Sequence, residues 1–151
     1  MAPSKQLAKE SFDRIVVLAV NGSEAELNGL RRLFAGSPWV LSTARTIAEA
    51  GKLLDQSTPA VVLCASQLPD GDWKDMLSVT AAMDPYPNVV VTSHLADDRL
   101  WSEALNQGAY DVQVLPADAT EFFRILSCAW RNWDRRCTNR RGNVYSLACI
   151  G

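Results

Sequence analysis

Hydrophobic residues are distributed along the chain in five short runs, and each run is followed by a segment with helical periodicity. The runs occupy residues 14–20, 38–42, 60–65, 88–93 and 110–115. Those at 14–20 and 60–65 are almost uninterrupted, which is typical of strands buried on both faces of a parallel sheet. The run at 38–42 is less uniform, and we expect it nearer an edge of that sheet.

Each predicted helix begins at a residue whose side chain can accept hydrogen bonds from the first helical turn. These residues are Ser23 with Glu26, Thr46 with Glu49, Asp72, Asp97 or Asp98, and Asp118 with Glu121. Ser or Thr followed three residues later by Glu predicts a capping box, in which two side chains satisfy free backbone amides reciprocally. Alternation of five strands with five helices predicts an α/β fold. Its architecture is a five-stranded parallel sheet in a doubly wound (βα)5 three-layer sandwich.

The length and composition are those of one compact domain. The 151 residues are 48% hydrophobic and 21% charged, which suits a globular protein with a core of ordinary size. We assign residues 13–136 to the domain, residues 1–12 to an N-terminal lead-in and residues 137–151 to a C-terminal tail. The formal net charge of −2 gives no general attraction to nucleic acid or to anionic membranes.

Two further features bear on the compartment. No apolar run approaches the roughly 20 residues that span a bilayer, and the N-terminal residues lack the apolar core of a signal peptide. The four cysteines, Cys64, Cys128, Cys137 and Cys149, show no CxxC spacing. This pattern suits a reducing compartment and predicts no metal site. We therefore expect a cytoplasmic protein without a membrane partner.

The carboxyl end of the run at 60–65 is where this fold class places its ligand or catalytic site. Ala65 occupies that end, so a methyl group stands where functional chemistry is expected. Two nearby motifs are informative, QLPDGD at 67–72 and ALNQGAYD at 104–111. Together with the five βα units, they make residues 13–136 resemble the receiver domain of bacterial two-component response regulators, a flavodoxin-like fold.

In that family, a pair of acidic residues and a third aspartate hold Mg²⁺, and the third aspartate accepts a phosphoryl group. The resemblance assigns the family's positions to Ala19 and Val20 for the acidic pair, Ala65 for the phosphoacceptor, Ser93 for the hydroxyl, Val112 for the switch aromatic and Leu115 for the lysine. Because Mg²⁺ needs oxygen ligands, usually including carboxylates, this set implies no cation and no acyl-phosphate. It predicts a degenerate receiver-like module without catalytic residues or cofactor, acting through phosphorylation-independent contact with a protein partner.

A competing hypothesis places small-ligand binding or catalysis in a cleft at the same edge of the sheet. Its walls would be Asn21, Ser66, Gln67, Ser93 and His94. His94 is the only histidine, and Cys64 or Asp97 could partner it in nucleophilic or acid–base chemistry. Carboxylates from Asp70 and Asp72 could supply a metal site only if their loop folded back over the cleft.

Exposed aromatic residues suggest a contact surface for a partner protein. Trp101 lies off the apolar face of the fourth predicted helix, and Phe123 and Trp130 lie seven residues apart in the last one, on a stripe displaced from its main apolar face. The alternative is that one broad apolar face of the helix packs on the sheet. Aromatic residues are enriched at interface anchor points. We therefore expect a homodimer or partner contact on the side formed by the fourth helix, fifth strand and fifth helix. The arginines of residues 131–141 have no recognition motif to support nucleic-acid binding.

Overall fold

The structure, a computed structural model, describes residues 15–95 and 97–150, with side chains as far as residue 139. Its elements are β1 (Ile15–Val20), α2 (Glu24–Phe34), β2 (Trp39–Ala44), α3 (Ile47–Gln56), β3 (Val61–Ala65), β4 (Gln67–Leu68), β5 (Gly71–Asp72), α4 (Trp73–Ala81), β6 (Asn88–Ser93), α5 (Asp98–Gln107), β7 (Asp111–Val114) and α6 (Ala119–Ile150). The five long strands are all parallel, in the order β2-β1-β3-β6-β7. The predicted fold class is confirmed, with β2 at one edge.

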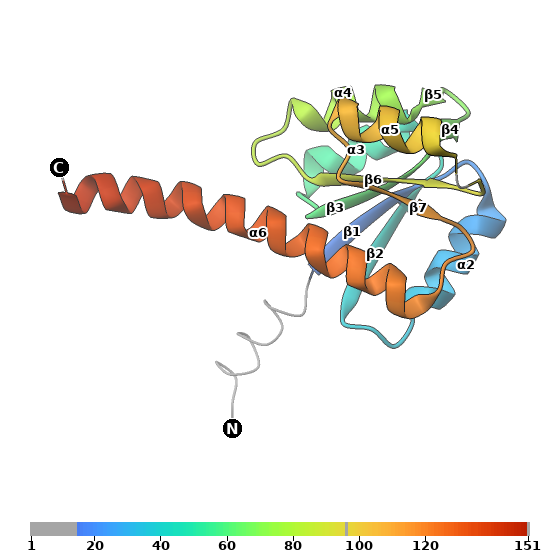
Figure 1. The fold of residues 1–151 in the computed structure, drawn as a ribbon, viewed down its shortest axis with the longest axis horizontal. Helices are drawn as coiled ribbons and strands as arrows, with labels where there is room; N and C mark the ends of the chain where they lie inside the picture. Colours follow the sequence, from blue (N-terminus) through green and yellow to red (C-terminus); the bar gives the residue numbers. More distant parts are fainter. Residues whose placement is uncertain (1–14, 96, 151) are drawn as a thin grey trace.

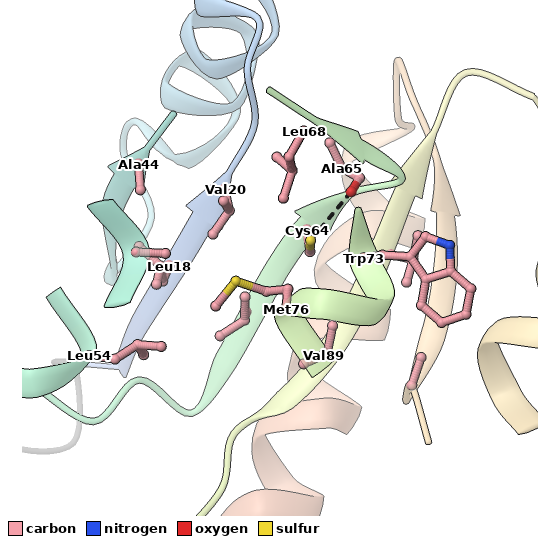
Figure 2. Close-up of a cluster of buried hydrophobic side chains, with 14 of the residues drawn as sticks. Leu18, Val20, Ala44, Leu54, Cys64, Ala65, Leu68, Trp73, Met76 and Val89 are labelled. Carbon is pink, nitrogen blue, oxygen red and sulfur yellow. Dashed lines mark hydrogen bonds between the residues drawn. The ribbon is translucent and has the colours of Figure 1, made fainter. Parts of the chain in front are cut away.

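Helices cover both faces of the sheet. Helices α3, α4 and α5 lie on one face, and α2 and α6 lie on the other (Figure 1). Side chains alternate along each strand, so β1 sends Leu18 and Val20 into the first layer and Val17 and Ala19 into the second. Figure 2 shows the first layer, where Met76 of α4 packs over the strands and is fully buried. These two apolar layers fix which residues reach the edge of the sheet.

Ser23, Thr46, Asp72 and Asp97 are N-caps as predicted, but the reciprocal capping boxes predicted at Ser23 and Thr46 do not form. At α3, the Glu49 side chain accepts a hydrogen bond from the Arg45 amide at 3.3 Å and not from that of Thr46. Asp72 and Asp75 form a complete capping box at α4.

At α2, the Ser23 hydroxyl accepts a hydrogen bond from the Glu26 amide at 3.3 Å, as predicted. The Glu26 side chain does not return to the Ser23 amide, which instead donates to the Asn21 side chain at 2.8 Å. Glu26 is therefore free to bind elsewhere.

Helix α6 is longer than the sequence pattern predicted. We expected the final helix to lose its pattern after residue 136, but the helical backbone continues to Ile150 and extends beyond the sheet (Figure 1). Residues 137–150 contain no proline, and the single Gly142 weakens a helix by only about 1 kcal/mol relative to alanine. A lapse in apolar periodicity removes packing against the sheet without ending the helix. The domain boundaries themselves stay a prediction.

A polar network fastens α6 to the start of β6. Asn88 is 8% exposed, and its Nδ2 donates to the Ala129 carbonyl at 2.7 Å and to Asn132 Oδ1 at 3.0 Å. Arg136 Nη2 donates to Asn88 Oδ1 at 2.8 Å, and its guanidinium lies 3.9 Å from the centroid of the Tyr86 ring. We call this set of residues the α6 clamp.

Candidate functional site

A cleft of about 560 Å³ opens at the carboxyl end of the sheet, over the ends of β1, β3 and β6. All five residues that the sequence placed in a cleft contribute to its walls, namely Asn21, Ser66, Gln67, Ser93 and His94. Ala65 also lines the cleft and is 8% exposed. The cleft therefore lies at the switch point between β1 and β3, the usual ligand position in open α/β sheets.

Ala19 and Val20 do not line this cleft, and the family positions that the resemblance gave them stay a prediction. Both are fully buried, Ala19 in the layer beneath α2 and α6 and Val20 in the opposite layer. Helices still cover the last residues of β1, so the rim begins one residue later, at Asn21 and Gly22. Beside Ala65, the rim thus presents an amide and a glycine, and neither carries a carboxylate.

A chain of three polar side chains crosses the rim. Asn21 is 4% exposed and donates from Nδ2 to Glu26 Oε1 at 2.6 Å. The other Glu26 oxygen, Oε2, pairs with His94 Nε2. Glu26 was missed as a site residue in the sequence because its carboxylate was assigned to the α2 cap. The available signal was an acid in the first turn of the helix that starts at the edge where His94 lies.

The electrostatics of His94 follow from these contacts. The hydrogen bond from His94 to Glu26 and the negative charge of Glu26 raise the pKa of His94, and the backbone of Leu115 adds to the shift. Both contacts favour the protonated ring, because each offers an acceptor to an imidazole N–H. The protonated form of His94 is thus favoured by its contacts with α2 and with the segment that follows β7.

Neither predicted partner of His94 is placed for nucleophilic chemistry. The Cys64 Sγ donates to the Ala65 carbonyl at 3.3 Å within the buried layer shown in Figure 2. Burial, with a smaller effect of the Asp72 charge, raises the pKa of this thiol to about 12. Asp97 instead accepts a hydrogen bond from the Arg99 amide at 2.9 Å, as the N-cap of α5.

The other positions given by the resemblance occupy different environments. Ser93 lines the cleft, and its hydroxyl accepts a hydrogen bond from the Leu95 amide at 3.2 Å. Leu115 is buried among the apolar side chains beneath α2 and α6. Val112 is partly buried against the layer on the α5 side of the sheet. The positions that the resemblance gives to the switch aromatic and to the lysine are thus both apolar side chains in this chain.

The two loop aspartates are directed at helix starts. Asp70 accepts hydrogen bonds from the amides of Ile47 at 2.9 Å and Ala48 at 3.1 Å, which lower its pKa. Asp72 caps α4. Gly71 lies between them at a crowded point, where a Cβ atom would come 2.7 Å from Ile47 Cδ1. Across the described residues, no group of three or more His, Cys, Asp or Glu side chains could hold a metal ion.

The three aromatic residues predicted as one contact surface are separated. Trp101 on α5 is 49% exposed. The Phe123 ring lies 5.4 Å from that of Phe34 and 6.2 Å from that of Trp39, so it faces α2 and β2, at the edge opposite β7. Trp130 is partly buried in the same layer. This corrects the predicted grouping, because only Trp101 stands on the α5 side. The described helices include none that is long and apolar enough to cross a membrane.

Comparison with known proteins identifies the fold. No protein-family model and no curated protein sequence matches the chain. Among solved structures, the signal receiver domain of an HD domain-containing protein from Pseudomonas fluorescens superposes with a TM-score of 0.76 at 25% identity, covering 83% of this chain and 93% of that one. A CheY-like response regulator receiver domain protein from Methanospirillum hungatei gives 0.70 at 16% identity, covering 82% and 98%. The Francisella response regulator 1452 receiver domain gives 0.71 at 17%, covering 79% and 98%.

The strand order and these superpositions agree. The chain has the fold of the receiver domain of two-component response regulators, as the sequence motifs predicted. Its cleft lies at the carboxyl end of the sheet, with Ala65 at the end of β3.

Proposed function

We propose that this protein is a receiver-like signalling module that acts without phosphorylation, through contact with a protein partner in the cytoplasm. The observation that carries the proposal is the rim of the cleft. Ala65 ends β3 with a methyl group, and the neighbouring rim residues after β1 are Asn21 and Gly22. Acyl-phosphate formation requires a carboxylate acceptor, and the cation that assists it requires oxygen ligands.

The internal bonding of the rim supports the same proposal. Asn21 uses both its carbonyl and its amide within the protein, and the Glu26 carboxylate bridges Asn21 and His94. Both Glu26 oxygens are thus occupied within the protein, so this carboxylate is a poor ligand for a cation. The rim is thus held together by its own side chains.

The competing hypothesis, a ligand-binding or catalytic cleft, has one observation in its favour: the predicted residues do converge. Two observations argue against catalysis. His94 pairs with Glu26, and the Cys64 thiol is buried with a raised pKa, which disfavours the nucleophilic thiolate. A general base must reach the proton of a nucleophile, and His94 Nε2 pairs with Glu26, with no hydrogen bond to the Ser93 hydroxyl among the described residues. We therefore assign the module no enzymatic role.

The decisive experiment exposes the protein to Mg²⁺ with acetyl phosphate and, separately, with beryllium fluoride. A phosphorylatable receiver domain run in parallel is the positive control. We expect an unchanged intact mass and an unchanged amide NMR spectrum. A mass increase of one phosphoryl group, or beryllium fluoride shifts around Ala65, would contradict the proposal.

For the partner contact, the exposed ring of Trp101 on α5 is the proposed anchor, either for a second copy or for another protein. Light scattering after size exclusion would measure the mass of wild type and Trp101→Ala. Val40→Ala is the matched control, because Val40 is 44% exposed on β2 at the other sheet edge. We expect Trp101→Ala alone to lower the assembly mass or to abolish binding of a partner recovered with the wild type. Equal assembly mass and equal partner binding in both variants would show that Trp101 is not an anchor of the contact.

A further inference from the structure

A second cavity, of about 500 Å³, lies beside the cleft between α2 and the segment that follows β7. We call it the α2 groove. One wall is the face of α2 that carries Ala25, Gly29 and Leu33, which follow one another at helical spacing. The opposite wall includes Leu115 and Ala117. The groove is thus apolar along most of its length.

Gly29 keeps the groove open. It lies in the middle of α2, and glycine is the weakest helix former after proline. A Cβ atom at Gly29 would meet nothing within 4 Å, so close packing does not explain the glycine. Any larger side chain at this position would project into the groove, whose open volume therefore depends on the missing side chain.

Buried leucines form the base of the groove. Leu30 is 3% exposed and Leu115 is 8% exposed, and both line the groove. Leu115 occupies the position that the resemblance assigns to a lysine, so the change that removes an ammonium group here also adds apolar surface. Sites for small molecules typically measure roughly 300–1,000 Å³ and are mainly apolar with a few polar groups. The α2 groove has these properties.

The charges around the groove select the ligand. Its ionisable lining residues are Glu26, Arg32 and His94. Glu26 and His94 pair with each other across one end of the groove. The Arg32 side chain makes no hydrogen bond or ion pair within the part of the chain that the structure describes, so its guanidinium is available to a ligand in the groove. A ligand with one acidic group complements this arrangement.

We propose that the α2 groove binds a small amphipathic anion, with an apolar ring or short chain against Gly29 and Leu115 and an acidic group near Arg32. This inference goes beyond contact with a protein partner. It gives the module a chemical input that does not involve the rim at Ala65. A failure to bind such an anion would leave the phosphorylation experiment unaffected.

The test uses 1-anilinonaphthalene-8-sulfonate, an apolar anion whose fluorescence rises in apolar sites, and N-phenyl-1-naphthylamine, which has the same ring system without the charge. We expect saturable one-site binding of the anion and roughly tenfold weaker binding of the neutral compound, because one charge interaction is lost. Equal affinity for the two compounds, or no saturable binding of the anion, would overturn the proposal.

Matched variants locate the site. Gly29→Leu fills the groove, and its control Gly51→Leu changes a glycine of α3 where a Cβ atom would likewise meet nothing within 4 Å. Arg32→Glu reverses the charge at the groove, and Lys52→Glu reverses an exposed charge on α3. We expect only Gly29→Leu to abolish binding of the anion and only Arg32→Glu to weaken it, roughly tenfold. Equal effects of site and control variants would refute the assignment.

Amide NMR of the wild type provides a readout that does not depend on any variant folding. Addition of the anion should shift signals of residues 25–33 and 115–117. Near-ultraviolet circular dichroism should stay unchanged, which separates binding in the groove from binding to a loosened core. Shifts confined to other regions would contradict the proposal.

Discussion

The two ends of the central sheet each carry a polar network, and the networks differ in depth. At the amino end, the α6 clamp is centred on Asn88, which is 8% exposed and holds α6 through Ala129, Asn132 and Arg136. At the carboxyl end, the Asn21–Glu26–His94 chain finishes in a His94 side chain that is 62% exposed. Breaking a buried hydrogen bond leaves groups unsatisfied, whereas water replaces an exposed partner. We therefore expect the α6 clamp to contribute strongly to the free energy of unfolding. We expect the Asn21–Glu26–His94 chain to contribute little, by an amount that depends on pH.

The largest expected effect comes from Asn88→Ala. It removes the hydrogen bonds to Ala129 and Asn132 and one of the three acceptors of the Arg136 guanidinium. We expect a loss of about 2–4 kcal/mol in the free energy of unfolding, measured by urea titration. Asn106→Ala on the exposed side of α5 is the control and should change stability by less than about 0.5 kcal/mol. Similar stability losses in both variants would show that the α6 clamp contributes no more to the free energy of unfolding than an exposed side chain does.

Ala65→Asp tests the carboxyl end with the next largest effect. A carboxylate would enter a position that is 8% exposed and packed among apolar side chains, including Leu68 and Trp73. We expect a loss of about 1–3 kcal/mol at pH 7 and no phosphoryl uptake from acetyl phosphate, because one carboxylate does not complete a cation site. Ala65→Ser, which adds a polar group without charge, is the control and should be milder. Phosphorylation of the Asp variant would show that the rim needs only an acceptor.

These two positions illustrate what the sequence could predict. The strands were found because buried parallel strands have long apolar runs, and both β6 and the end of β3 matched closely. Ala65 at the cleft followed from that local pattern. Glu26 was missed because its partner His94 lies 68 residues away, and no local pattern reports such a contact. The burial of Ala19 and Val20 away from the cleft wall could not be predicted either, because strand periodicity does not show where the covering helices stop.

The aromatic residues show the same limit on a helix. Phe123 and Trp130 were predicted to form a stripe displaced from the main apolar face of the last helix, but they pack in the same layer as Phe122 of that face. Helical periodicity gives the angle between two stripes but not which neighbour each one meets. Phe34 and Trp39 come from α2 and β2, and only the assembled layer brings them to Phe123. A stripe predicted to be exposed therefore contributes to the core.

Arg136→Lys distinguishes charge from geometry in the α6 clamp. Lysine retains the charge but cannot reproduce the contacts to Asn88, Asn132 and the Tyr86 ring at once. We expect a loss of about 1 kcal/mol in the free energy of unfolding, smaller than that of Asn88→Ala. Arg135→Lys, on an exposed position of the same helix, is the control. An unchanged stability in Arg136→Lys would mean that charge alone accounts for the contribution of this residue.

The smallest effect concerns the rim chain and depends on pH. Glu26 raises the pKa of His94 above its ordinary value of 6.5, so the folded protein holds this proton more tightly than the unfolded chain. The resulting stabilisation is fully present below pH 6.5 and is lost as the pH rises through the folded-state pKa. Because the chain has one histidine, its NMR signal reports this pKa directly. We expect a midpoint above 6.5 in the wild type.

Glu26→Gln is the matched variant, because it keeps the shape of the side chain and removes the charge that raises the pKa. Its His94 midpoint should return towards 6.5, and its melting temperature should approach that of the wild type as the pH rises. His94→Gln should show the same convergence. A wild-type midpoint equal to that of Glu26→Gln would show that the rim pair does not form in solution. Convergence in both variants would establish that the stability of the carboxyl end of the sheet depends on pH through the Glu26–His94 pair.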